Sequence, residues 1–334
     1  MFHRLKLKFA SVLMLALASI LNTEAQLPSP SATPLFPQLQ PLNQTPPPQQ
    51  SQPLQPGVQT PPPEPARDIP LLEKKWEELS NHEIGDYGKV ALAIKPDRWK
   101  HAESENFIFH FRRYTEARKV VREIEYDLWF VAVALGATKD QYSSKSHVFI
   151  FEDQAEWDSF IAKVNRPAWV QSYAQLDELF LNVRQNNGIL DSHTLAHETT
   201  HAVVARLYKP ELYGRWPIWL DEGFAEYMGG ASVAARTHQL PASKMRNLGN
   251  ALIPLDDLAA TKKYPDDPIK VAEFYQSSEK FVRFLMTKSP KERFLKFIDA
   301  VIGGKSMEDA VMEIYGDQYK DFDTFKKKYE VFTK

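Results

Sequence analysis

The chain has 334 residues, of which 43% are hydrophobic and 25% are charged, as is usual for a globular protein. Its formal net charge of -2 provides no basic field to hold nucleic acid, so we expect no nucleic-acid partner. The complete absence of cysteine excludes disulfides, cysteine nucleophiles, iron–sulfur clusters and thiolate zinc sites.

The first 25 residues have the pattern of a signal peptide. Residues 4–8 carry three basic side chains, Phe9–Leu21 is an apolar run of 13, and small residues precede a cleavage site after Ala25. A membrane-spanning helix needs about 20 apolar residues, which this run does not provide. We therefore expect residues 1–25 to be removed and the mature protein to be exported, either to a periplasm or outside the cell. An uncleaved N-terminal anchor is the alternative, and we expect no membrane insertion of the mature domain.

Residues 26–68 form a segment rich in proline and glutamine. Fourteen of the 24 prolines lie between Pro28 and Pro65, and Phe36 is the only aromatic residue among them. Such a segment cannot bury enough apolar surface to offset the entropy lost on ordering. We expect a disordered linker of polyproline II character, with docking of a proline-binding partner as the alternative. The folded domain is then expected at residues 69–334.

Apolar periodicity predicts mixed elements first and helices afterwards. In chain order, the expected elements are a helix at 71–79, a strand at 106–112, a helix at 115–135, a strand at 146–151, a helix at 154–164 and a strand at 176–182. Helices then follow at about 190–207, 217–229, 269–288, 290–302, 306–315 and 318–331. This order predicts an α+β fold, in which a small mixed or antiparallel sheet with helices precedes a mainly helical C-terminal half.

The expected helix near residue 200 contains the sequence His-Glu-x-x-His. Its histidines, His197 and His201, are four residues apart, so they lie on one helix face and can present two imidazoles to one metal ion. Glu198 lies about 100° further round the helix, where its carboxylate can reach a water on that metal. The motif therefore predicts a catalytic metal site.

A third ligand is available on the next expected helix. The stretch Trp216–Tyr227 contains Glu222, which follows His201 by 21 positions, enough for a turn that brings the second helix back to the first. Two histidines and one glutamate with an open fourth position are typical of catalytic zinc, so we expect one Zn²⁺ as cofactor. Glu226, one turn after Glu222, is expected to accept the free ring N–H of a ligand histidine.

These residues resemble those of the gluzincin metallopeptidases, and among them the peptidase-MA-like domains related to the metallo-aminopeptidases. The resemblance is carried by residues 195–204 and by Trp219–Tyr227, which is close to the Trp-Leu-x-Glu-Gly-x-Ala-Glu signature of that group. A looser similarity extends from about Ser104 to the C-terminus. The resemblance implies a thermolysin-like catalytic domain that hydrolyses peptide bonds in peptide or protein substrates.

By the same resemblance, His197, His201 and Glu222 are the metal ligands and Glu198 is the general base. Tyr275 corresponds to the tyrosine that stabilises the oxyanion in the aminopeptidases. His238 is an alternative donor, because a histidine has this role in thermolysin-like enzymes.

The sequence leaves the role of His193 and the specificity of the peptidase open. His193 lies four residues before His197 and could pair with it, although a capping or supporting role is expected instead. The Gly-x-Met-Glu-Asn motif that binds the substrate amine in aminopeptidases has no match, and the nearest carboxylates are those of Asp177 and Glu178. Endopeptidase and aminopeptidase activity therefore both remain open. A zinc-holding binding or envelope-tethered module without catalytic activity is the alternative function.

Overall fold

The computed structural model describes residues 64–66, 68–168, 170–184, 191–238 and 252–333. The expected signal peptide and most of the expected linker lie outside these residues. Within the described part of the chain, no helix is both long and apolar enough to cross a membrane.

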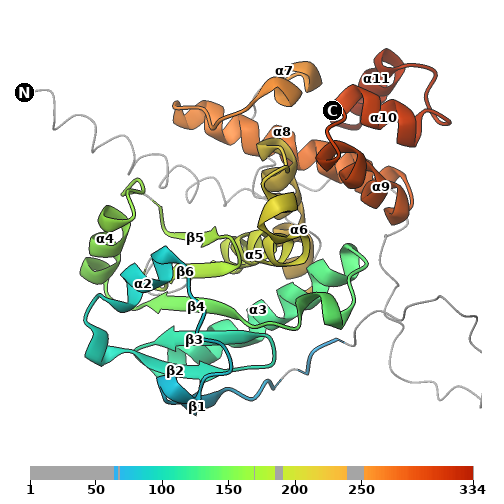
Figure 1. Ribbon diagram of the computed structural model, residues 1–334. Helices are drawn as coiled ribbons and strands as arrows, with labels where there is room; N and C mark the ends of the chain where they lie inside the picture. The colour runs from blue at the N-terminus through green and yellow to red at the C-terminus, as the bar shows by residue number, and fades with distance from the viewer. Residues whose placement is uncertain (1–63, 67, 169, 185–190, 239–251, 334) are drawn as a thin grey trace, which may run out of the picture.

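A six-stranded mixed sheet forms the first part of the fold (Figure 1). In spatial order its strands are β1 (Leu72–Lys74), β2 (Lys100–Glu103), β3 (Phe107–Phe111), β4 (Ser146–Phe151), β6 (Glu178–Asn182) and β5 (Ser172–Gln175). The central strands β3, β4 and β6 are parallel, and all other pairs are antiparallel. Strand β5 lies at one edge of the sheet, next to the first helix of the C-terminal half.

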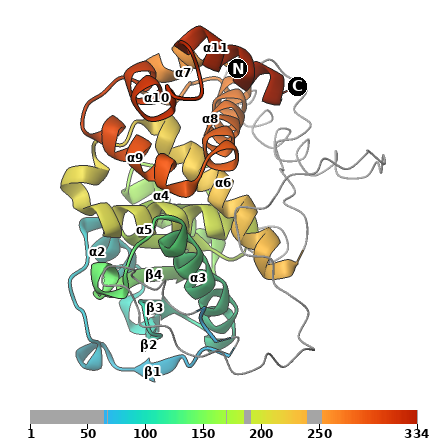
Figure 2. The same ribbon diagram turned by 90° about the vertical axis from the view of Figure 1, so that its right-hand side faces the viewer.

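Helices cover both faces of the sheet and then form a layer of their own (Figures 1 and 2). They are α2 (Asp86–Leu92), α3 (Tyr114–Ala134), α4 (Gln154–Lys163), α5 (Ser192–Tyr213), α6 (Ile218–Thr237), α7 (Leu255–Ala260), α8 (Pro268–Lys288), α9 (Lys291–Ile302), α10 (Met307–Tyr315) and α11 (Phe322–Thr333). Helices α3 and α5 contact one face of the sheet, and α2 and α4 contact the other. Helices α6 to α11 lie beyond α5, so the α+β expectation is confirmed.

The two faces of the sheet bury separate apolar clusters because side chains alternate along each strand. Phe109, Val148 and Leu181 belong to the larger cluster, which includes α3, α5 and the C-terminal helices. Phe149 and Phe180 belong to a smaller cluster under α2 and α4. Because every second residue of a strand faces the same side, each strand residue can be assigned either to the face covered by α5 or to the face covered by α2.

Two buried charged side chains attach α3 and α5 to the turn between β2 and β3. The carboxylate of Glu125 in α3 accepts hydrogen bonds from Ser104 Oγ and from the backbone and side-chain nitrogens of Asn106. The guanidinium of Arg206 in α5 donates to the Asn106 carbonyl at 3.2 Å and to the carbonyl of Tyr142. The turn around Ser104 is therefore fixed to both α3 and α5 by buried hydrogen bonds.

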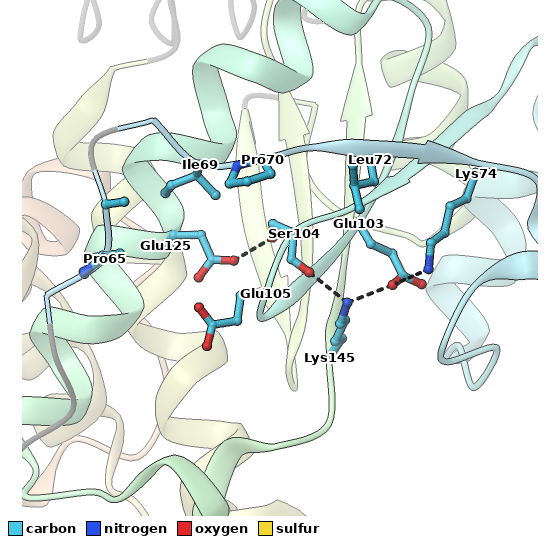
Figure 3. A pocket seen from close by; sticks show the side chains of 11 residues that line it. Pro65, Ile69, Pro70, Leu72, Lys74, Glu103, Ser104, Glu105, Glu125 and Lys145 are labelled. Atoms are coloured by element: carbon cyan, nitrogen blue, oxygen red, sulfur yellow. Dashed lines mark hydrogen bonds and ion pairs between the residues drawn. The ribbon is translucent and has the colours of Figure 1, made fainter.

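A cavity of about 430 Å³ lies beside this turn, under the segment that leads into β1 (Figure 3). Three of its charged groups are paired with one another, since Glu103 binds Lys74 at 3.0 Å and Lys145 at 2.7 Å. The carboxylate of Glu125 is bound by Ser104 and Asn106 as described above. Pro65, from the end of the expected linker, forms part of the wall. The cavity is lined by none of the residues of the His-Glu-x-x-His helix.

Several elements differ from those expected. The helix expected at 71–79 is wrong, because residues 72–74 pair with β2 as strand β1 and only a 3₁₀ turn, Trp76–Glu78, follows. Strands β2 and β5 and helices α2 and α7 are not among the predicted elements. Helix α5 extends past its expected end at 207, but Lys209, with a φ of 56°, interrupts it just before Pro210. The expected end therefore coincides with a true break in the helix.

Helix α6 packs between α5 and α8, and two of its glycines allow this close approach. A Cβ atom at Gly223 would lie 2.4 Å from the carbonyl oxygen of Ser278 in α8. A Cβ atom at Gly229 would lie 3.2 Å from the carbonyl oxygen of His193 in α5. These contacts fix how close Glu222, the residue before Gly223, comes to the other two helices.

We predict that Gly223→Ala lowers the free energy of unfolding by about 1–3 kcal/mol, because α6 and α8 must separate to admit the methyl group. Gly230→Ala, on the same helix, is the matched control, since nothing lies within 4 Å of its added Cβ. That substitution should raise stability by up to about 1 kcal/mol through helix propensity. Denaturant unfolding of both variants measures the difference, and equal effects would contradict this account of the packing.

Candidate metal centre

Helix α5 presents the motif residues from a well-defined start. Asp191 caps the helix, and its carboxylate accepts hydrogen bonds from Thr194 N at 3.1 Å and Thr194 Oγ1 at 2.9 Å. Because the helix is regular up to Lys209, His197 and His201 lie one turn apart, on the face toward α6. Helix α6 begins after Pro217, which places Glu222 in its second turn opposite both histidines.

Three potential ligand atoms converge between α5 and α6. His197 Nε2 and His201 Nε2 are 3.1 Å apart, and Glu222 Oε2 lies 3.3 Å from the first and 3.5 Å from the second. All three residues are buried, and they form the single group with metal-binding geometry among the described residues. Glu222 Oε2 accepts no hydrogen bond from any described residue.

Each ligand imidazole faces a second carboxylate through its other nitrogen. His201 Nδ1 lies 3.0 Å from Asp221 Oδ1, whose other oxygen accepts a hydrogen bond from the Tyr213 hydroxyl at 3.0 Å. His197 Nδ1 lies 3.1 Å from Glu226 Oε1. These carboxylates favour the tautomer with the proton on Nδ1, which leaves the Nε2 lone pair of each ring directed at the centre.

The electrostatics of the cluster favour positive charge at its centre. Burial would lower the pKa of His197, but Glu226 and Glu222 outweigh it and raise that pKa to about 10. Burial is likewise outweighed at His201, where Asp221 and Glu222 raise the pKa well above its usual value. Burial would raise the pKa of Glu222, yet the two imidazoles hold it well below its usual range. Protons or a cation must therefore compensate the buried carboxylates.

The donor set and its spacing fit zinc. A tetrahedral zinc ion about 2.05 Å from its ligands holds them roughly 3.3 Å apart, and the three edges here are 3.1, 3.3 and 3.5 Å. Two imidazoles with one carboxylate suit zinc better than magnesium or calcium, which prefer shells made of oxygen alone. Three lone pairs that face one another in a buried site also repel unless a cation lies between them.

Glu198 points to a different neighbour. Its Oε2 accepts a hydrogen bond from the backbone N–H of Ala174 in β5 at 2.9 Å, which ties the helix to the edge strand. Among the described residues, nothing hydrogen-bonds its other oxygen, Oε1. Burial raises the pKa of Glu198 above its usual value, against the opposing effect of His197 and His201.

The two candidate donors lie in very different places. The ring of Tyr275 in α8 lies 6.2 Å from that of His197, centroid to centroid. Burial and the nearby carboxylates, Glu222 first among them, raise the pKa of Tyr275 well above its usual value, so its hydroxyl keeps its proton. His238 lies 16 residues after Glu222, at the exposed C-terminal end of α6, about 24 Å along the helix axis. The geometry favours Tyr275 over His238.

His193, Asp177 in the β5–β6 turn and Glu178 at the start of β6 lie outside the three-residue centre. His193 Nε2 lies 3.0 Å from Glu226 Oε2, so Glu226 joins this ring to that of His197. Glu178 is turned to the α2 side of the sheet, where it accepts a hydrogen bond from Gly85 N at 2.7 Å. Asp177 accepts one from Ser146 Oγ at 3.2 Å.

Residues 134–332 match the Peptidase MA superfamily. The chain belongs to this superfamily. The match covers more than half of the sequence, including the whole of α5, α6 and α8, and it confirms the gluzincin resemblance. No curated protein matches the sequence significantly.

Three residues around the Peptidase MA centre were not singled out by the sequence. Asp221 precedes Glu222 directly, and a carboxylate next to a ligand is a signal that could have suggested it. Tyr213 and Tyr264 carry no such signal. Tyr264, in the loop between α7 and α8, donates a hydrogen bond from its hydroxyl to Glu222 Oε1.

We predict one tightly bound zinc per chain, lost in the double variant His197→Ala, Glu222→Ala, because two of three donors are then missing. Metal analysis of the purified, dialysed protein measures this. His193→Ala is the matched control: its imidazole is outside the three-donor group, so about one zinc should remain. Stoichiometric zinc in the double variant would show that the ligands are other residues.

Proposed function

We propose that this chain is a zinc peptidase that hydrolyses peptide bonds, with Glu198 as general base. The observation that carries the proposal is the position of Glu198 beside the three-donor centre. One of its oxygens is held by Ala174 N at 2.9 Å, and the other is left without a partner among the described residues. A module that only bound zinc would have no use for a carboxylate oriented in this way.

His197, His201 and Glu222 would hold the zinc ion. Bound there, zinc supplies Lewis acidity that polarises the scissile carbonyl and lowers the pKa of water toward 7. Glu198 Oε1 then accepts a proton from the attacking water and returns it to the leaving nitrogen. The neutral hydroxyl of Tyr275 donates a hydrogen bond to the oxygen on which negative charge develops.

The edge strand supports an extended peptide as substrate. Strand β5 lies at the end of the sheet, and Ala174 in this strand contacts the general base directly. An extended peptide that pairs with an edge strand is positioned by main-chain hydrogen bonds, with little dependence on its sequence. Such a substrate would therefore pass close to Glu198 and to the metal.

The proposal extends to the part of the chain outside the described residues. The pattern of residues 1–25 supports export, to a periplasm or beyond the cell, with the domain either released or tethered through an uncleaved anchor. The proline-rich linker at 26–68 would then hold the domain away from the membrane or from other components of the envelope.

We predict that Glu198→Gln keeps the zinc and the fold but lowers peptide cleavage by about 10²–10⁴-fold, because an amide cannot accept the proton. Tyr275→Phe should lower cleavage by roughly 10²–10³-fold with unchanged zinc content. Cleavage of a peptide library with free and acetylated N-termini, followed by mass spectrometry, measures both effects.

His238→Ala is the control and should cleave like the wild type, because its side chain lies far from the centre. The library also distinguishes endopeptidase from aminopeptidase activity, since only the latter requires the free amine. A zinc-loaded wild type that cleaves nothing would favour the zinc-holding module, and an active Glu198→Gln variant would exclude Glu198 as the base.

A further inference from the structure

The two carboxylate oxygens of Glu222 have different surroundings. Oε2 faces His197 Nε2 and His201 Nε2 at 3.3 and 3.5 Å and accepts no hydrogen bond among the described residues. Oε1 accepts a hydrogen bond from the hydroxyl of Tyr264. One oxygen is thus directed at the metal centre, and the other is already bound on the opposite side.

Tyr264 reaches Glu222 from a loop, and its ring is held by aromatic neighbours. The ring stacks on Tyr275 with centroids 6.4 Å apart and an interplanar angle of 21°. It also contacts Phe274 edge-on, with centroids 6.1 Å apart. The residue is 46% exposed, yet its hydroxyl binds the buried carboxylate of Glu222. Hydrogen bonds to ionised groups are stronger than those to neutral ones, which explains this choice.

A carboxylate can bind a metal through one oxygen or through both. If Oε1 of Glu222 stays hydrogen-bonded to Tyr264, only Oε2 remains as a donor. Two imidazoles and a single oxygen then make three protein ligands, and a fourth position stays open, as hydrolytic zinc sites require.

We propose that Tyr264 is a positioning residue that keeps Glu222 bound to the metal through one oxygen. This inference rests on the metal site of the proposed function, but not on peptide cleavage itself. Tyr264 would also connect the loop before α8 to the metal site, and its ring stacks on that of Tyr275.

The test compares Tyr264→Phe with the wild type in the full chain, using cobalt and zinc as probes. Phenylalanine keeps the stacked ring and removes only the hydroxyl. With Oε1 free to join the metal, the visible absorption of the cobalt-loaded variant should weaken, as it does when four-coordinate cobalt gains a ligand. Zinc affinity, measured by competition with a chelator, should fall by about 10-fold or more, as for other residues that orient a ligand.

Tyr275→Phe is the matched control, because it removes a hydroxyl from the stacked partner without touching Glu222. Its cobalt spectrum and zinc affinity should match those of the wild type. A Tyr264→Phe variant with unchanged spectrum and affinity overturns the inference, as does the same spectral change in Tyr275→Phe. If Tyr264→Phe behaves as expected while the wild type cleaves no peptide, only the proposed function fails. A wild type that binds no metal overturns both.

A second, independent observation concerns three histidines on the α2 side of the sheet, well away from the metal ligands. His101 in β2, His110 in β3 and His147 in β4 form what we call the histidine chain. His101 Nδ1 lies 2.8 Å from His110 Nδ1, and His110 Nε2 lies 2.9 Å from His147 Nδ1. His110 and His147 are buried, and His147 Nε2 has no hydrogen-bond partner among the described residues.

The segment before α2 covers this chain. The Trp76 ring lies over His101 and His110, with centroid distances of 5.5 and 5.9 Å. His82 contacts the same tryptophan edge-on at 5.4 Å, and its Nε2 bonds the Trp76 carbonyl at 2.8 Å. Residues 76–82 are therefore held on the sheet through imidazole contacts.

Protonation changes what these contacts can do. A neutral imidazole has one N–H, so the chain can order its two hydrogen bonds in either direction. When one proton is added at the partly exposed His101, its Nδ1–H can donate to His110 Nδ1, and His110 Nε2–H can donate to His147 Nδ1. A second proton makes two N–H groups face each other across one of the contacts, which replaces attraction by repulsion.

The charged groups that face the chain do not compensate for a second proton. Glu77, from the 3₁₀ turn, is exposed, and Glu103, from β2, is already paired with Lys74 and Lys145. His82, from the covering segment, offers no negative charge. Glu178, from β6, accepts from Gly85 N at the start of α2.

We infer that the histidine chain is an acid-sensitive latch, which holds residues 76–82 on the sheet at neutral pH and releases them in mild acid. Burial, followed by the charge of neighbouring groups, lowers the pKa of His147 to about 4 and that of His110 well below its usual value. A lowered pKa means that the docked form binds fewer protons. Docking is then complete above about pH 6.5 and is lost as the pH falls below that value. Burial raises the pKa of Glu178 to about 7, which acts in the opposite direction, but it is one group against several.

Hydrogen exchange of the full chain, corrected for the intrinsic effect of pH, tests this inference. Amides in residues 76–82 should lose at least about 10-fold of their protection between pH 7 and pH 5. His110→Gln keeps a donor and an acceptor but does not titrate, so it should lose much less. His238→Gln, at an exposed histidine far from the chain, should behave like the wild type.

Equal protection of the wild-type segment at both pH values overturns the latch. An undiminished acid response in His110→Gln does so too. If His110→Gln does not fold, His101→Gln at the half-exposed end gives the same comparison.

Discussion

The structure depends on an excess of carboxylate between α5 and α6, of which Glu222 is buried and the others are partly buried. Two imidazoles are surrounded there by four acidic side chains, those of Glu198, Asp221, Glu222 and Glu226. Uncompensated buried charges cost several kcal/mol each, so this arrangement is stable only with positive charge at its centre. Two protonated imidazoles can supply it at the expense of their lone pairs, whereas a divalent cation supplies it and uses those lone pairs as ligands. The charge distribution alone therefore favours a metal.

The close packing of α6 turns this charge requirement into a defined geometry. Gly223 lets α8 approach until its backbone nearly touches α6, directly beside the candidate ligand Glu222. Helix α8 places the Tyr275 ring beside that of His197, and the loop before α8 brings the Tyr264 hydroxyl to the carboxylate of Glu222. Gly223 thus determines how close the tyrosines of α8 and its preceding loop come to the candidate ligands, although glycine has no side chain to take part in the chemistry.

The sequence predicts that His197, His201 and Glu222 come together because the geometry that joins them is local. A spacing of four residues places His197 and His201 on one face in any helix, and the signature around Glu222 adds the third donor. Tyr264 was not predictable in this way, since it comes from a loop with no periodicity and reaches Glu222 only through the packing of α8. The sequence also does not identify strand β1. Its three residues are too few to show the alternation of apolar and polar side chains typical of a strand, and pairing with β2 decides their conformation.

The residues before the superfamily match contribute to the support of α5. The match begins at residue 134, after β1 to β3 and almost all of α3. Yet β3 pairs in parallel with β4, which lies inside the match, and the Asn106 carbonyl in the turn before β3 accepts a hydrogen bond from Arg206 of α5. Removing the first strands would expose one edge of the central sheet and leave the buried guanidinium with one partner fewer. The residues before position 134 therefore help to orient α5, because its contacts come from both sides of the start of the match.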